Sequence, residues 1–218
     1  MGKQKIARDQ RRKDRARAID AFTAVAGDIF ADEYDQRRVG ACLNATRVCI
    51  DALRTFGVTL RPAVVHMLVM NKAWTDLMAV HNRWPNSKED ADRWEEAGAW
   101  MLAIGQDSDE HPGRDWPHHI VAVGHGQLID ASAGQANRPQ RNIPMPMVLT
   151  LPMPVALPTN GYYHWACETG VTVAYREETN VLPANRPENM SGFSRHALNN
   201  LAVNRVVTAM RRWLKGSA

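Results

Sequence analysis

Apolar positions recur at helical spacing at both ends of the chain and around residue 45, and they change to strand-like runs in between. Residues 3–31 lack proline and glycine from Lys3 to Ala26, which predicts one long helix. Its apolar stripe occupies only the second half, so we expect the first half to project, because it has little to bury. Residues 194–215 predict a second amphipathic helix, with Ser194 as its N-cap.

The stretch Gln36–Gly57, QRRVGACLNATRVCIDALRTFG, is apolar over most of its helical circumference from Val39 onward. A helix of that kind is normally central to a domain. Gly57 suits the position just after the last turn, where a left-handed backbone conformation ends many helices.

The remaining pattern predicts strands with two inserted helices. Residues 63–70 are a near-continuous apolar run of strand length, and two hairpins are expected, 119–124 with 127–131 and 162–167 with 171–176. Helical spacing covers 72–81 and 89–104. Six prolines within 139–158 leave room only for broken or edge strand. The order predicts an α+β fold, with a central helix packed on a mostly antiparallel sheet and helices at both ends of the chain.

Composition fits one soluble globular domain, since 218 residues with 44% hydrophobic and 23% charged side chains suffice for a single core. We expect a basic helical extension over residues 1–31 and a single α+β domain over 32–218. No apolar run approaches 18 residues, and no apolar signal core follows the basic start, so we expect a cytoplasmic location.

Positive charge is concentrated at the start of the chain. Residues 1–17 carry eight basic and two acidic side chains, a net +6, whereas the whole chain carries +4, so residues 18–218 sum to −2. Two interpretations stay open: a contact for nucleic acid or an acidic protein partner, or a solvated helix with no specific partner.

Three cysteines cannot all pair, and they lack zinc-ligand spacing with histidines, so we expect reduced thiols and neither a metal nor a cofactor. Cys42 falls in the first turn of the predicted central helix, where the helix dipole and unpaired N–H groups acidify a thiol. Cys49, seven residues later on the same face, and Cys167, within a predicted strand, are interpreted as core residues.

A base and an orienting carboxylate are available downstream. His119 begins one strand of the first predicted hairpin and Asp130 ends the other, so both lie at its open end and meet if they share a face. His118 is the alternative base, because a register shift of one residue in the hairpin would place His118, in place of His119, on the face of Asp130. His66, inside an apolar strand, is interpreted as a core histidine.

The segment RRVGACLNATRVCIDALRTFGV resembles the nucleophile helix of arylamine N-acetyltransferases and, more broadly, of the transglutaminase-like and papain-like cysteine superfamily. The offsets of Arg38, Gly40 and Gly57 from Cys42 are similar to that family's pattern, and HHIVAVGHGQLIDASAGQ is similar to its His and Asp strands. Leu43 and Asn44 replace the aromatic and acidic residues that acetyltransferases have after the Cys. The resemblance therefore implies the triad but not acetyl-CoA specificity.

These features lead to the hypothesis of a cysteine acyl-transfer enzyme with Cys42 as nucleophile, His119 as base and Asp130 as its orienting group. Gln36, six residues before Cys42, has the offset of the oxyanion-hole glutamine of papain-like proteases. Trp116 and Gln135 are candidates for binding the peptide, amide or acyl-donor substrate. The acyl acceptor stays open between water, as in a protease or amidase, and an amine. The alternative hypothesis is a non-catalytic binding module of the same fold, in which the basic residues 1–17 bind nucleic acid or an acidic protein partner.

Overall fold

The structure is a computed structural model, which describes residues 2–33, 41–105, 118–153, 156–181, 186–189 and 197–216. Within these residues there are five α-helices: α1 (Gly2–Glu33), α2 (Ala41–Arg54), α3 (Lys72–His81), α4 (Lys88–Glu96) and α5 (Ala197–Gly216). Short 3-10 turns occur at Ala133–Ala136, Pro139–Arg141 and Pro187–Asn189. No helix in the described ranges is long and apolar enough to cross a membrane.

In the same part of the chain, seven strands form one antiparallel sheet: β1 (Arg61–Met70), β2 (Met101–Ile104), β3 (His119–Gly124), β4 (Gln127–Asp130), β5 (Leu149–Pro152), β6 (Tyr163–Ala166) and β7 (Thr172–Glu177). The order is β5-β4-β3-β1-β7-β6, and β2 pairs with the second half of β1. The two edge strands, β5 and β6, approach each other. The Trp165 indole N–H on β6 donates a hydrogen bond to the Pro152 carbonyl on β5 at 2.7 Å. The sheet is thus a nearly closed barrel, and the fold is α+β as predicted.

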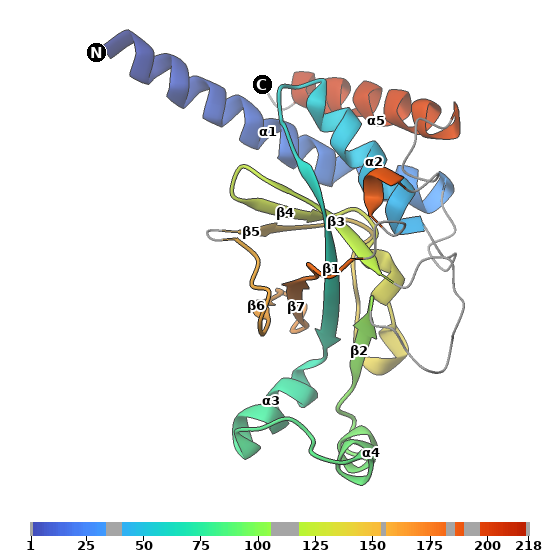
Figure 1. The fold of residues 1–218 in the computed structure, drawn as a ribbon. Coiled ribbons are helices and arrows are strands. Elements are labelled where there is room, and N and C mark those ends of the chain that lie inside the picture. The colour runs from blue at the N-terminus through green and yellow to red at the C-terminus, as the bar shows by residue number, and fades with distance from the viewer. Residues whose placement is uncertain are drawn as a thin grey trace.

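The two faces of this sheet bury different clusters. Side chains from six of the strands, among them Val65, Val121 and Leu128, meet on the inner face. Their sequence neighbours, such as Val64 and Ile120, face outward and pack against the helices. Figure 1 shows α1, α2 and α5 together on that side, with α3 and α4 at the opposite end of the molecule.

The helix α1 joins the core only through its second half. Ala18, Phe22, Ala26 and Phe30 are buried in the same cluster as α2 and α5, whereas most residues from 4 to 14 are exposed. The predicted long helix with a projecting first half is therefore confirmed. The N-cap predicted at Ser194 lies outside the described residues.

The central helix ends as predicted. Gly57 has a φ of 75°, and its N–H donates to the Arg54 carbonyl at 3.0 Å. The first hairpin is also confirmed: His125 and Gly126 both have positive φ, the geometry of a two-residue turn whose twist matches that of paired strands. The expected edge strand within 139–158 is β5, which lies at one end of the sheet order.

The prediction of one helix over 89–104 is wrong in its second half. The helix α4 ends at Glu96, Gly98 takes a left-handed φ of 80°, and Met101–Ile104 form β2 along β1. The Asn71 side chain stabilises this turn, since its oxygen accepts from the Trp100 N–H at 3.0 Å. The apolar residues at helical spacing in this segment belong to two separate elements. The strand has only four residues, which are too few to distinguish the helical period of 3.6 from the strand period of 2.

Candidate active site

The first turn of α2 brings Cys42 to the start of β3. The Cys42 side chain is buried, and its sulfur lies 4.0 Å from the carbonyl oxygen of His118. One turn further along, the Thr46 hydroxyl donates to the Ile120 carbonyl at 3.0 Å. Cys42 and Thr46 share a helix face, and their partners are two residues apart, one just before β3 and one within it. These contacts hold α2 in register with the strand that begins at His119.

The hairpin places His119 and Asp130 on one face, as their positions in the sequence predicted. Val123 pairs with Leu128, so counting outward from the turn puts residues 119 and 130 on the same, inner face. The His119 Nε2 lies 2.7 Å from the Asp130 Oδ2. His119, rather than His118, is thus the histidine that contacts Asp130.

Asp130 is fully buried and has further partners. Its Oδ1 accepts from the Ser132 backbone N–H at 3.0 Å and from the Ser132 hydroxyl at 3.3 Å. Its Oδ2 accepts from the Tyr175 hydroxyl at 2.8 Å. A buried carboxylate requires such compensation, because it has lost its hydration.

Tyr175 is a site residue that sequence reasoning missed. It lies on β7, which is separated from β4 by two strands, and its side chain is fully buried on the inner face. Its hydroxyl reaches Asp130 because the sheet curves into a barrel. The only signal in the sequence is a weak one, a tyrosine alternating with Val173 in a predicted strand.

The protonation of the pair follows from its surroundings. Burial by itself lowers the pKa of His119, but the charge and hydrogen bond of Asp130, with a contribution from the Cys42 sulfur, raise that pKa to about 10. Burial raises the pKa of Asp130, while His119, Ser132 and Tyr175 oppose it and hold that pKa below its ordinary value. These effects favour an imidazolium paired with a carboxylate at neutral pH.

The second ring nitrogen of His119 is directed away from Asp130. Its Nδ1 is buried and makes no hydrogen bond of standard geometry with any described residue. The Cys42 sulfur also interacts electrostatically with this ring. One imidazole therefore has a carboxylate on one nitrogen and a thiol near the ring, the order of groups that cysteine nucleophile chemistry requires.

Of the other predicted site residues, the structure describes Gln135, and it is not joined to this cluster. Gln36 and Trp116 lie outside the described residues. Gln135 is half-buried in the turn after β4, and its contacts with Ser132 and Arg138 are made through its backbone. Its side chain makes no hydrogen bond within the described ranges, so its role in substrate binding stays a prediction.

The remaining candidates have other partners. Cys49 is fully buried, and burial, followed by the charge of Asp130, raises its pKa. Cys167 is half-buried just after β6, beyond the strand that was predicted to contain it. The His66 Nε2 lies 2.8 Å from a Glu178 carboxylate oxygen at the edge of the core.

Among the described residues, no group of three or more His, Cys, Asp or Glu side chains is arranged to hold a metal ion. No protein-family model, curated protein or solved structure matches this chain.

Proposed function

We propose that this protein is a cysteine-dependent acyl-transfer enzyme that acts on a peptide, an amide or another acyl donor. The observation that carries the proposal is the connected series Cys42, His119, Asp130, in which one imidazole contacts a buried carboxylate and interacts with a thiol at a helix N-terminus. The resemblance of the nucleophile helix to transglutaminase-like and papain-like enzymes supports the same chemistry.

In this proposal the reaction begins with the Cys42 sulfur as a thiolate beside the His119 imidazolium. An imidazolium and the first turn of a helix both favour a thiolate. The thiolate attacks the substrate carbonyl carbon, and the resulting oxyanion is stabilised by backbone N–H groups of the first turn of α2 that have no partner within the helix. Gln36, six residues before the nucleophile, is a candidate for the second oxyanion donor.

The leaving group departs with the proton of His119, and the acyl group remains on Cys42 as a thioester. His119, now neutral, takes a proton from the acceptor, water or an amine, as the acceptor attacks the thioester carbonyl. Collapse of this second tetrahedral species releases the product and restores the thiolate and the imidazolium. Asp130 keeps the ring oriented throughout, and Tyr175 and Ser132 keep Asp130 oriented.

An activated ester tests the proposal without knowledge of the natural substrate. The protein is incubated with p-nitrophenyl acetate, and acetylated residues are mapped by mass spectrometry. We expect a thioester on Cys42 that hydroxylamine releases at neutral pH, none at position 42 in Cys42→Ala, and much slower turnover in His119→Asn. Acceleration of turnover by an added primary amine identifies an amine acceptor, and its absence identifies water.

Acetylation confined to lysines, or a Cys42 thioester that forms and breaks down equally fast in His119→Asn, contradicts the proposal. Both outcomes mean that the thiol receives no help from the imidazole.

A further inference from the structure

The first half of α1 presents regularly spaced cations on one side. Lys5, Arg8, Arg12 and Arg15 follow one another at intervals of three or four residues and therefore share a helix face. The first three side chains are exposed, and Arg15 is half-buried. At a rise of 1.5 Å per residue, this cationic face extends about 15 Å along the helix.

This face forms one wall of a groove. The groove has a volume of about 820 Å³ and runs between α1 and the turn that joins β3 to β4. Among the described residues, four cations and one acid, Asp9, line the groove, a net charge of +3. Ala16 and Ile19 lie at the end where α1 enters the core.

The described residues of the opposite wall are uncharged. This wall contains the His125 ring and the Gln127 carboxamide. Burial, and then the charge of Arg15, lower the pKa of His125, and its Nε2 accepts a hydrogen bond from the Thr59 N–H at 3.2 Å. His125 is therefore a neutral aromatic ring held in place beside a row of guanidinium groups.

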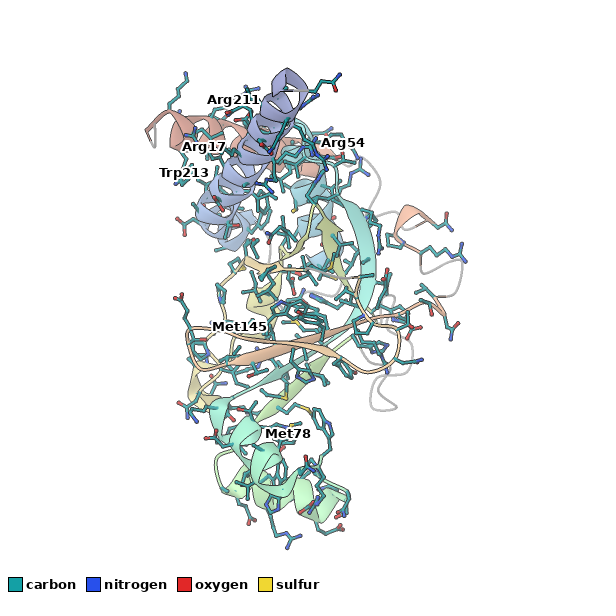
Figure 2. The ribbon with its side chains drawn as sticks, turned by 90° about the vertical axis from the view of Figure 1, so that its left-hand side faces the viewer. Arg17, Arg54, Met78, Met145, Arg211 and Trp213 are labelled. Atoms are coloured by element: carbon teal, nitrogen blue, oxygen red, sulfur yellow. The ribbon has the colours of Figure 1, made fainter. Side chains whose placement is uncertain are left out.

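The same end of the molecule has further positive charge. Figure 2 shows Arg17 on α1 and Arg211 on α5 at the end of the molecule where these helices meet, and Met78 on α3 at the opposite end. The Arg17 guanidinium donates to the Leu214 carbonyl at 3.4 Å. Arg17 thus contacts α5 and is not among the residues that line the groove.

We propose that the groove between α1 and the β3–β4 turn, called here the α1 groove, binds a single strand of nucleic acid. The guanidinium groups contact successive phosphates, for which their planar donor geometry is suited. The His125 ring offers a face on which a base or sugar stacks, and Gln127 offers both a donor and an acceptor. An acidic peptide would use the cations but has no need of a neutral aromatic wall.

The α1 groove is separate from the candidate active site. His125 and Gln127 lie at the turn of the hairpin, and His119 and Asp130 lie at its open end. Six strand positions separate His125 from His119, about 20 Å, and three separate Gln127 from Asp130, about 10 Å. Loss of one function therefore does not imply loss of the other.

Fluorescence anisotropy of a labelled single-stranded oligonucleotide tests the proposal in the full chain. The groove variant is Arg8→Gln with Arg12→Gln. The matched control is Lys13→Gln with Arg17→Gln, which removes the same charge from the other side of α1. Circular dichroism and Cys42 reactivity, both expected to be unchanged, verify the fold of each variant.

We expect the groove variant to raise the dissociation constant at least tenfold and to reduce the slope of log affinity against log salt by about 1.4, since each single-strand phosphate contact contributes about 0.7. The control should change affinity less than twofold. His125→Ala should weaken binding without changing the salt slope, because a stacking contact releases no counterion.

Three results overturn the proposal. Equal weakening by the groove and control variants means that binding depends on total charge alone. Tighter binding of a duplex of the same sequence means that the ligand is not a single strand. Binding of polyglutamate at least as tight as that of the oligonucleotide means that the surface is made for an acidic protein.

Discussion

At the scale of single residues, Asp130 has the most demanding position in the molecule. It is a fully buried carboxylate that accepts four hydrogen bonds, one from His119, two from Ser132 and one from Tyr175. A buried charge of this kind is tolerated only when it is paired and hydrogen-bonded. Each partner therefore contributes to stability as well as to the orientation of His119.

The hydroxyl of Tyr175 provides a direct test of this position. We expect Tyr175→Phe to lower the free energy of unfolding by about 1.5–3 kcal/mol, the usual contribution of a hydrogen bond to a charged group. Tyr163→Phe is the matched control, because Tyr163 is half-buried and its hydroxyl makes no hydrogen bond in the described part of the chain. Urea denaturation gives both values. Equal changes in the two variants would mean that the bond to Asp130 contributes nothing particular.

The pH dependence of stability reports the same pair. The pKa of His119 is raised from 6.5, so its contribution is complete below pH 6.5 and is lost as the pH rises toward about 10. The pKa of Asp130 is lowered from 3.8, so its contribution is present above pH 3.8 and is lost as the pH falls below it.

This dependence is measured in a Cys42→Ser background, so that the thiol does not titrate. We expect the difference in unfolding free energy between Cys42→Ser and Cys42→Ser with His119→Gln to be largest between pH 4 and 6.5 and to shrink as the pH rises toward 10. A difference that stays constant from pH 6.5 to 10 contradicts a charged His119.

At the scale of elements, the start of β3 is fixed from two sides. The helix α2 is held through Thr46 and Ile120, and the end of β2 meets the same point through Gly105. Gly105 has a φ of 82°, and a Cβ there would come within 2.6 Å of the Val65 carbonyl and 2.7 Å of the His119 nitrogen. Only glycine allows the chain to pass so close to the candidate base.

We therefore expect Gly105→Ala to destabilise the protein by roughly 3 kcal/mol or more, because backbone atoms must move in addition to the strain of a left-handed residue. Gly98→Ala is the control: Gly98 has a φ of 80°, and a Cβ added there would meet no atom within 4 Å, so about 1 kcal/mol is expected. Thermal and urea unfolding compare the two. If the two variants are equally stable, the close approach at His119 is not tight.

The elements show which parts of the sequence were informative. Long periodic segments and hairpins were predicted well, because α1, α2 and the 125–126 turn each have strong local signals. The positions of His119 and Asp130 on one face were predicted by counting residues outward from the same turn. Residues 101–104 were assigned wrongly, because their strand state depends on pairing with β1, a contact distant in sequence.

At the scale of the whole molecule, curvature of the sheet completes the cluster. Tyr175 reaches Asp130 across two intervening strands, and no local pattern in the sequence encodes that distance. The basic half of α1 was visible in the sequence, whereas the groove beside it was not, because its second wall comes from the β3–β4 turn, more than a hundred residues later.

The two halves of α1 should differ sharply in their importance for folding. We expect Phe22→Ala to lower the free energy of unfolding by about 3–5 kcal/mol, because the ring is fully buried against α2 and α5. Ile6→Ala, at a side chain that is 70% exposed on the same helix, should change it by less than about 0.5 kcal/mol. Equal effects in urea denaturation would contradict the packing of α1 into the main core.

The central claim, that His119 activates Cys42, is tested most directly by the rate of Cys42 alkylation as a function of pH. A Cys167→Ser background leaves Cys42 and the fully buried Cys49 as the only thiols. With iodoacetamide, we predict rapid labelling of Cys42 that persists well below pH 8.5, the ordinary thiol pKa. In His119→Asn, we predict that this labelling below pH 8.5 is lost. Labelling that rises only near pH 8.5 in both proteins, or no labelling of native Cys42 at any pH, would contradict activation of the thiol by His119.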